Sequence, residues 1–391
     1  MLYQKSVDII KSLFEQPMLR VFYSKGMDFL FSCINAVFSN RTRVEHTFEK
    51  ILIIKLSALG DVLAFSPIPR LIKQHSAVEV HHLVMESCAD ATKYNPFVDK
   101  QIVIPDFPSS SIKNNIMVIF NLIITLRAQN YRKAIIFHRN FFFQLLCKVA
   151  GVRLIFGYAS SKNIFLTQYL DYKFNINRTL QDVSLLKLSG YNTPFPKKLE
   201  FYFPNNKIDV TSFGIPEIYV AINPGGGNFH SPADNRIWPM EKYIDLIEKL
   251  KKPVVLLGHG ASDESRCNFI EKNIRHGEVI NLSGRTSLLQ AAIILKKAIL
   301  YIGNDSAMIF LSSALDTPYL GIYGPTQVEA CFPIGKNGDY LISQVSCSPC
   351  YNPFDGMSGS MYVCKNNVCM QSVEVDIVFE KANNLLNIIK K

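Results

Sequence analysis

Asp61 is the first residue of this 391-residue chain whose type and setting could do chemistry. It follows the continuous apolar run Ile51 to Ile54, which is typical of a buried parallel strand, and it precedes a helix predicted over Val62 to Lys73. A carboxylate at the end of such a strand can accept a proton from a substrate hydroxyl, and a helix N-terminus favours its ionised form. An aspartate at this position would equally suit a helix N-cap. Both interpretations are open at this point.

A second set of residues could hold an anion. Consecutive glycines after an apolar strand let backbone amides approach a phosphate closely, and an arginine just before a helix could clamp a diphosphate. A further helix start after another strand presents an acidic and a hydroxyl side chain. Each unit alone also fits a tight turn, a solvated arginine or a helix cap, so only their conjunction indicates a nucleotide-phosphate site. The residues are Gly225, Gly226, Gly227, Arg236, Asp305 and Ser306.

Alternating strands and helices must position these residues. Such alternation predicts an α/β fold of two doubly wound, Rossmann-like domains that face a central cleft, with ligands at the carboxyl ends of the strands. A stretch rich in Pro, Lys and Asn, residues 192–216, is predicted to link the domains. The predicted parts are an amphipathic extension (1–48), an N-terminal Rossmann-like domain (49–205) and a C-terminal Rossmann-like domain that includes the cysteine-containing C-terminal segment (206–391). The strands are predicted at 51–54, 80–84, 101–104, 133–137, 218–222, 253–257, 279–282, 298–302 and 319–323.

Composition limits the class of protein. Hydrophobic residues make up 48% and charged residues 19%, which is enough apolar content for a large core and excludes a disordered or collagen-like chain. The net charge of +10 favours anionic partners. No segment has the roughly 20 apolar residues of a spanning helix, and the N-terminus lacks the pattern of a secretory signal. The first 48 residues predict a helix with basic flanks, either on a membrane surface or docked on the body of the protein.

The cysteines favour a reducing cytoplasm, because five of the nine are scattered without framework spacing. The other four are compactly spaced, as C-x2-C, thirteen residues, then C-x4-C. Four thiolates at this spacing could hold a structural Zn²⁺, although free thiols packed in a loop are slightly favoured. These four are Cys347, Cys350, Cys364 and Cys369.

Taken together, the motifs resemble glycosyltransferase family 9, the ADP-heptose:lipopolysaccharide heptosyltransferases. The resemblance runs from Ile51 to about Leu386, and the motifs agree with the family in order and spacing. They are Ile51-Leu-Ile-Ile-Lys-Leu-Ser-Ala-Leu-Gly-Asp-Val62, Asn95-Pro-Phe-Val-Asp99, Ala150-Gly-Val-Arg-Leu-Ile-Phe-Gly-Tyr158, Asn223-Pro-Gly225, Arg236-Ile-Trp-Pro239, Leu282-Ser-Gly-Arg-Thr-Ser-Leu288, Gly303-Asn-Asp-Ser306 and Gly321-Ile-Tyr-Gly-Pro-Thr326.

The resemblance implies a GT-B fold, in which the domain of residues 49–205 binds the acceptor and the domain of residues 206–391 binds the nucleotide-sugar. It also implies a role for each matching residue. Asp61 takes the position of the catalytic base, and Arg236 that of a basic residue near the diphosphate. Asp305 matches an aspartate that contacts the donor, while either Asp263 or Glu264 meets the nucleoside ribose. The turn residues before the base lie on the acceptor side. These turn residues are Ser57, Leu59 and Gly60.

One motif departs from the family pattern. After Asp305 and Ser306, the family usually has Gly and then His, whereas this chain has Ala307 and Phe310. Alanine crowds a close backbone approach, and phenylalanine removes a polar contact to the donor. The departure therefore bears first on which donor is used, and less strongly on activity.

The expected function is transfer of a sugar, with heptose from ADP-heptose as the leading donor, to a lipopolysaccharide or lipooligosaccharide core. The reaction would be a single inverting displacement that needs no catalytic metal, at the inner membrane of a Gram-negative bacterium. The alternatives are another nucleotide-sugar or glycan acceptor, or a catalytically silent nucleotide-binding homologue. No recognition motif supports a nucleic-acid partner, and the incomplete dinucleotide fingerprint at Gly258 to Asp263 argues against an oxidoreductase.

Overall fold

The computed structural model describes residues 49–108, 110–161, 163–226, 234–351 and 364–389. The predicted N-terminal extension, residues 1–48, lies outside the described residues. Residues 48–391 form one compact unit, and the predicted division into domains at residue 205 stays a prediction. None of the helices in the described ranges is long and apolar enough to span a membrane.

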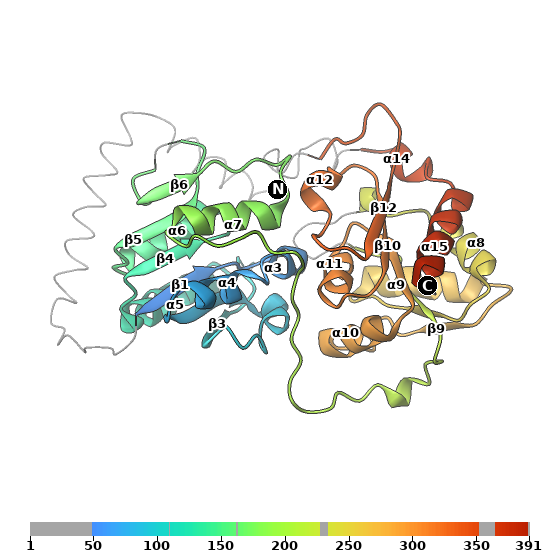
Figure 1. Cartoon of the computed structure of the whole chain (residues 1–391), viewed down its shortest axis with the longest axis horizontal. Coiled ribbons are helices and arrows are strands. Elements are labelled where there is room, and N and C mark those ends of the chain that lie inside the picture. Colours follow the sequence, from blue (N-terminus) through green and yellow to red (C-terminus); the bar gives the residue numbers. More distant parts are fainter. Residues whose placement is uncertain (1–48, 109, 162, 227–233, 352–363, 390–391) are drawn as a thin grey trace. The chain divides into compact units, whose positions relative to one another are not determined.

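Two six-stranded sheets organise the chain, and every strand pairing in them is parallel (Figure 1). The N-terminal sheet has the order β3-β2-β1-β4-β5-β6 and the C-terminal sheet the order β12-β11-β10-β7-β8-β9. Each is the doubly wound Rossmann order, so the predicted fold class is confirmed. The strands are β1 (Lys50–Ile54), β2 (Glu79–Met85), β3 (Lys100–Ile104), β4 (Lys133–Ile136), β5 (Leu154–Tyr158), β6 (Gln168–Leu170), β7 (Val220–Asn223), β8 (Val254–Leu256), β9 (Val279–Asn281), β10 (Leu300–Asn304), β11 (Tyr319–Tyr323) and β12 (Gly338–Ile342).

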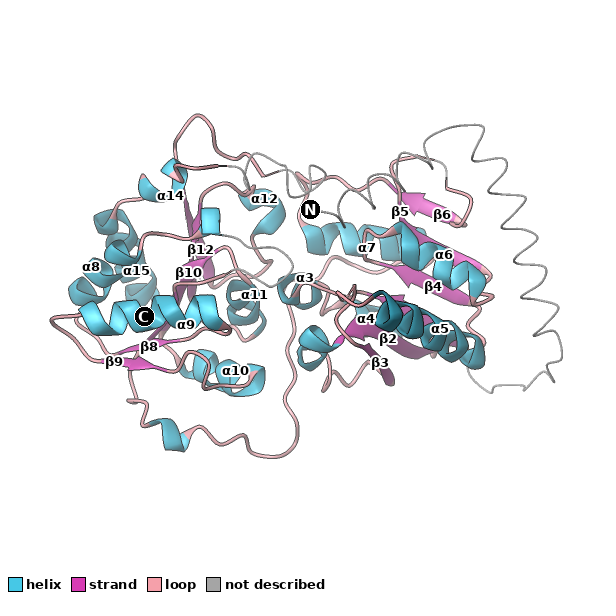
Figure 2. Cartoon of the chain, turned by 180° about the vertical axis from the view of Figure 1, so that it is seen from behind, coloured by secondary structure: helices cyan, strands magenta, loops and turns pink. Residues whose placement is uncertain are grey.

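Helices cover both faces of each sheet (Figure 2). The α-helices are α3 (Leu59–Ala64), α4 (Ile68–His75), α5 (Ile112–Gln129), α6 (Phe141–Val149), α7 (Arg178–Leu188), α8 (Met240–Leu250), α9 (Ala261–Asn273), α10 (Leu288–Lys297), α11 (Ala307–Ala314), α12 (Val328–Cys331), α14 (Val368–Gln371) and α15 (Val375–Ile389). Short 3-10 helices are η1 (Glu86–Ala91), η2 (Thr211–Phe213) and η3 (Asp234–Arg236).

Strand β1 shows why the sequence reads as a continuous apolar run. Ile51 and Ile53 face the cluster formed with α4 and α7, while Leu52 and Ile54 face the cluster formed with α5 and α6. All four side chains are almost completely buried. A parallel strand covered on both faces needs apolar residues at every position, and this burial fixes the position of the turn that follows.

The structure corrects the sequence prediction at several elements. The single helix predicted over Val62 to Lys73 is two helices, α3 and α4, because Pro67 lies between them and a proline cannot continue a helix. Strands β5, β6 and β12 and helix α7 were not predicted. Strands β6 and β12 are edge strands with no fully buried residue, so they lack the apolar run that marks the central strands.

A buried ion pair joins β1 to α7. Lys55, directly after β1, donates to Asp182 of α7 at 2.8 Å, and both side chains are less than a tenth exposed. Tyr158, at the end of β5, donates to the other oxygen of the Asp182 carboxylate at 2.7 Å. The Lys55 ammonium also donates to the carbonyl of Phe137. Because each buried charge has a partner, this network fixes the start of α7 against the carboxyl edge of the sheet.

Replacement of Lys55 tests this network. We expect Lys55→Met to lower the free energy of unfolding by about 3–5 kcal/mol, because Asp182 would keep a buried charge without its ion-pair partner. The control is Lys198→Met, which removes an ion pair with Asp316 whose side chains are both more than half exposed, and should cost less than about 1 kcal/mol. Urea denaturation measures both. Equal losses in the two variants would contradict a buried role for the Lys55–Asp182 pair.

Candidate active site

Asp61 lies in the first turn of α3, directly beyond the carboxyl end of β1. Its Oδ1 accepts a hydrogen bond of 2.5 Å from Nη1 of Arg178, the first residue of α7. Oδ2 of Asp61 accepts no hydrogen bond from the part of the chain that the structure describes, and the side chain is 37% exposed. Asp61 thus has one oxygen held by a guanidinium and a second oxygen that a substrate could reach.

The charges around Asp61 keep it ionised. Burial opposes ionisation, but Arg178, followed by Lys55 and Arg139, outweighs burial and holds the pKa of Asp61 below its ordinary value. Burial, aided by Lys55, lowers the pKa of His138 in the same neighbourhood to about 4, so this imidazole is neutral at pH 7. At neutral pH the site therefore contains an ionised carboxylate among positive charges.

Arg178 connects Asp61 with elements of the C-terminal sheet. Its Nη2 donates to Sγ of Cys331 in α12 at 3.0 Å, and its guanidinium carbon lies 5.2 Å from the ring centroid of Phe310 in α11. Asn177, the N-cap of α7, donates to the carbonyl of Phe332 at 2.7 Å. The first residues of α7, including Arg178, therefore contact both Asp61 and the helices that follow strands of the C-terminal sheet.

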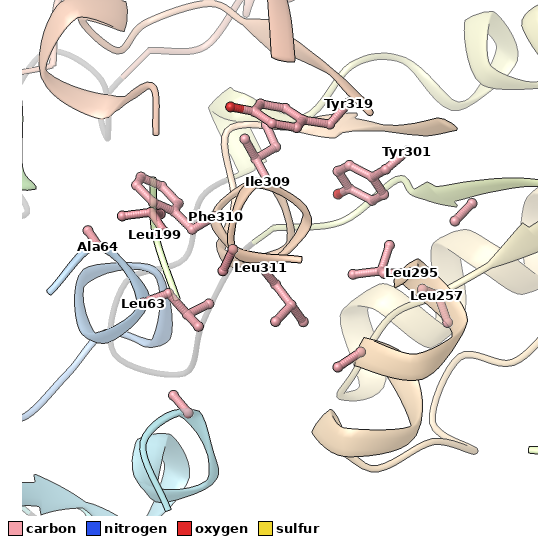
Figure 3. Packing of buried hydrophobic residues seen from close by; sticks show 14 of the residues in the cluster. Leu63, Ala64, Leu199, Leu257, Leu295, Tyr301, Ile309, Phe310, Leu311 and Tyr319 are labelled. Carbon is pink, nitrogen blue, oxygen red and sulfur yellow. The ribbon is translucent and has the colours of Figure 1, made fainter. Parts of the chain in front are cut away.

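Phe310 belongs to an apolar cluster that joins α3 and α11. Its side chain is 2% exposed and packs in one cluster with Leu63 and Ala64 of α3 (Figure 3). A Cβ on Gly60 would lie 3.4 Å from the Phe310 ring and 3.4 Å from Cα of Ala307. The phenylalanine that replaces the histidine of the family pattern thus fills a packed position and offers its ring face to Arg178.

The three residues predicted on the acceptor side lie in the turn between β1 and α3. Leu59 packs against the α3–α11 cluster, and Gly60 lies against α11. Ser57 is half-buried in the same turn. The structure therefore brings them to the sheet edge next to Asp61, and two of them contact elements of the C-terminal sheet.

On the C-terminal sheet, the loop after β7 contains the predicted phosphate-binding glycines. Gly226 has φ of 142°, in the region that favours glycine, and the N–H of Gly225 donates to the Asn223 side chain at 2.8 Å. Asn304, at the end of β10, donates to the carbonyls of Pro224 and Gly225 at 3.0 and 2.9 Å. Gly227 lies outside the described residues. These two hydrogen bonds from Asn304 therefore hold the backbone of the glycine loop in place.

Arg236 and Asp305 form an ion pair beside this loop. Nη1 of Arg236 lies 3.3 Å from Oδ2 of Asp305, whose side chain is buried. Nε of Arg236 is also buried and has no hydrogen-bond partner among the residues the structure describes. Ser306, which precedes α11, lies close to Gly226. A Cβ built on Gly226 would be 3.1 Å from the Cβ of Ser306. The described part of the glycine loop, Arg236 and the start of α11 thus lie next to one another, and their role in binding a donor stays a prediction.

Asp263 and Glu264, in the first turn of α9, differ in their surroundings. Asp263 is buried beneath the glycine loop, where a Cβ on Gly225 would overlap its carboxylate. Its Oδ2 accepts a hydrogen bond from the His259 amide, and burial raises its pKa. Glu264 is half-buried and lies next to Gly284. Asp263 therefore supports the loops after β7 and β8, while Glu264 lies nearer their surface.

The four C-terminal cysteines are free thiols. Cys369 is buried and burial raises its pKa to about 11, whereas Cys347 and Cys364 are exposed. Within the described ranges, no three His, Cys, Asp or Glu side chains are grouped so as to hold a metal ion. The geometry therefore gives no support to the zinc interpretation.

Two residues of this site were missed from the sequence. Arg178 lies in a stretch that carries no recognised motif, and only the fold brings it to Asp61. Asn304 stands inside Gly303-Asn-Asp-Ser306 but was not assigned a role. Its side chain accepts from Trp238 N and Tyr243 Oη at 3.0 Å each, in addition to donating to the glycine loop. A polar residue at the end of an otherwise apolar central strand was the available signal for Asn304.

Two doubly wound sheets, each with polar side chains at its carboxyl edge, have the architecture of the GT-B class of glycosyltransferases. The sequence model of the protein family glycosyltransferase family 9 (heptosyltransferase) matches residues 119–358 of this chain. The chain belongs to this family and is a glycosyltransferase.

Individual relatives agree with this assignment. Lipopolysaccharide heptosyltransferase 1 of Campylobacter coli is 27% identical over 71% of this chain and 84% of its own length. The structure of E. coli ADP-heptose lps heptosyltransferase II matches 88% of this chain and 100% of its own, with a TM-score of 0.67 and 20% identity. E. coli heptosyltransferase WaaC with ADP matches 86% and 99%, with a TM-score of 0.65 and 18% identity. These two structures share the fold.

Replacement of Arg178 tests what keeps Asp61 ionised. In the native protein the lowered pKa means that Asp61 stays charged in both folded and unfolded states above about pH 5, so its contribution to stability is constant there and is lost only at lower pH. In Arg178→Gln, burial should dominate and raise this pKa. Ionised Asp61 would then destabilise the fold increasingly as the pH rises from about 4 to 6.

Urea denaturation across this pH range measures the effect, as the difference between Arg178→Gln and Arg178→Gln/Asp61→Asn. The control background is Arg132→Gln, which removes an exposed arginine 3.9 Å from Glu49. A difference that stays flat with pH in the Arg178→Gln background would show that Arg178 does not control the ionisation of Asp61.

Proposed function

We propose that this chain transfers heptose from ADP-heptose to a saccharide of a lipopolysaccharide or lipooligosaccharide core, with Asp61 as general base. The observation that carries the proposal is the ionised, one-third exposed Asp61 with only one oxygen held by Arg178. The relatives named as lipopolysaccharide heptosyltransferases, and the WaaC structures with ADP and with ADP-2-deoxy-2-fluoro heptose, support the choice of donor and acceptor class.

The proposed reaction is a single inverting displacement. Oδ2 of Asp61 takes the proton of the acceptor hydroxyl as that oxygen forms a bond to the anomeric carbon of heptose. The bond between the anomeric carbon and the diphosphate oxygen breaks on the opposite face, and ADP leaves with the electron pair. No residue of the enzyme forms a covalent intermediate, and Asp61 is regenerated when its proton passes to water.

The leaving diphosphate would be held on the C-terminal sheet. Arg236 supplies a positive charge, and its buried Nε is a donor that has no partner in the described chain. The start of α11 would add backbone donors near the place where charge develops, whereas the amides of Gly225 and Gly226 already donate to Asn223 and Asp263. Asp263 and Glu264 remain our candidates for the ribose, with Glu264 favoured because Asp263 is occupied beneath the loop. This arrangement supplies the charge that a catalytic metal would otherwise provide.

The acceptor would bind beside the turn Ser57 to Gly60. The net charge of +10 fits an anionic glycolipid, and we place the enzyme on the cytoplasmic face of the inner membrane of a Gram-negative bacterium. Ala307 and Phe310 favour a second candidate, a family member with a different nucleotide-sugar or without activity. Against the inactive form, Phe310 is the platform for Arg178, so its presence preserves the environment of Asp61.

Nucleotide binding tests the donor. We expect ADP and ADP-heptose to raise the melting temperature, and UDP, GDP and CMP to leave it unchanged. Arg236→Gln should weaken ADP binding about ten- to hundredfold, because a charge-assisted contact is lost. Arg275→Gln, an exposed arginine after α9, is the control and should bind like the wild type. Selective binding of another nucleotide would exclude heptose from ADP-heptose, and no binding at all would favour the silent homologue.

Replacement of Asp61 tests the base. Asp61→Asn should lower the transfer rate by about 10²–10⁴-fold, because the proton acceptor is removed, while ADP affinity stays within about twofold. Asp90→Asn, an exposed aspartate of η1, is the control and should keep full activity. Transfer is measured with ADP-heptose and core acceptor extracted from cells that lack this enzyme. Full turnover by Asp61→Asn would contradict the proposed role.

A further inference from the structure

Helix α5 exposes an apolar face. It packs on the N-terminal sheet through Leu122 and Leu126, which are buried, and lies across that sheet in Figure 2. Its outward side chains are large, apolar and 44% to 61% exposed. At 3.6 residues per turn they fall within an arc of about 100°, so they form one stripe. This stripe, Ile116, Met117, Phe120 and Ile124, is called the α5 face below.

Exposed apolar side chains of this size are usually covered by a partner. Helix α6, which packs beside α5 in the same buried cluster, adds the exposed Phe141 at its first residue. Asn163 donates to Gln144 of α6 at 2.6 Å, and this contact brings the highly exposed Ile164 near the start of α6. The apolar surface of this side of the sheet therefore extends beyond one helix.

The charge of this part of the chain is unusually one-sided. Between Phe107 and Leu170 the sequence contains no Asp or Glu, whereas it contains eight Lys and Arg residues. Such a segment repels a basic partner and is attracted by an anionic surface. The eight are Lys113, Arg127, Arg132, Lys133, Arg139, Lys148, Arg153 and Lys162.

The α5 face begins at the edge of the sheet that carries Asp61. Helix α5 follows β3, and α6 follows β4, so both start at the carboxyl edge of a parallel sheet. Asp61 follows β1 at that same edge. Anything that covers the first turns of α5 therefore lies on the side of the sheet from which an acceptor would reach Asp61.

We propose that the α5 face docks on an anionic lipid bilayer. The apolar stripe would enter the boundary between headgroups and acyl chains, and the exposed Lys113 of α5 and Lys148 of α6 would contact anionic headgroups. The helix would lie in the plane of the interface. This inference rests on the proposed function, because that function supplies an acceptor held in a membrane. Its own evidence is that the exposed apolar stripe lies in a segment that contains Lys and Arg but no Asp or Glu.

Vesicle binding by the full chain tests the proposal. We expect co-sedimentation with vesicles of phosphatidylethanolamine and phosphatidylglycerol (about 7:3), and little with phosphatidylcholine alone. Phe120→Gln/Ile124→Gln should weaken binding at least about tenfold, because two side chains lose their apolar burial. The matched control, Phe269→Gln/Ile377→Gln, changes the same residue types at exposed positions of α9 and α15 and should bind within about twofold of the wild type.

A second variant reports insertion without removing the apolar face. The only tryptophan of the chain, Trp238, is completely buried, so Phe120→Trp adds a probe on α5 against a constant background. Its emission should shift to the blue with anionic vesicles and be quenched by brominated acyl chains. Emission that is unchanged by vesicles, including emission already blue because residues 1–48 cover the face, would overturn the proposal.

The remaining outcomes are also decisive. Vesicle binding that persists in Phe120→Gln/Ile124→Gln overturns the proposal. If the wild type is also found to be a dimer and this variant a monomer, the face is assigned to a second copy of the chain. Absence of vesicle binding by the wild type overturns it as well. The thermal shift with ADP is measured on the same samples. If the wild type binds ADP but not vesicles, only the proposal that the α5 face docks on a bilayer is contradicted. If the wild type does not bind ADP, the proposed function is contradicted.

Discussion

The ion pair between Asp61 and Arg178 is the interaction on which the candidate active site depends. A carboxylate that is partly withdrawn from water stays charged only if a positive group compensates it, and Arg178 does so at 2.5 Å. Arg178 in turn contacts Phe310 and Cys331, which belong to elements of the other sheet. The ionisation of Asp61 is therefore coupled to the packing that joins α7, α11 and α12.

The proposed donor side is built differently, with buried polar side chains that hold the backbone in place. Asn304 binds the carbonyls of the glycine loop, and Asp263 lies beneath the same loop with no room for a side chain at Gly225. Such groups are stable when buried because each is hydrogen-bonded. The loop is thereby held beside Arg236 and the start of α11, which would supply positive potential for a diphosphate.

Except for β5, the central strands and the position of Asp61 could be predicted because burial on both faces leaves a clear apolar run in the sequence. The glycine loop, Arg236 and Asp305 likewise follow such runs, and the fold brings them together. Arg178 could not be predicted, since its contact with Asp61 spans 117 residues of chain and no local pattern marks it. Strands β6 and β12 were missed because edge strands need no continuous apolar run. The contact between the Phe310 ring and the Arg178 guanidinium could not be predicted either, because a residue-by-residue comparison with the family does not show which side chains pack together.

The central claim is that one base at one sheet edge and one diphosphate site at the other carry out a single displacement. The stereochemistry of the product tests this most directly. The anomeric configuration of the transferred heptose, determined by NMR after reaction with ADP-heptose and extracted core acceptor, should be opposite to that of the donor. Retention of the donor configuration would contradict the account, because it would require a second nucleophile or attack from the face of the leaving group.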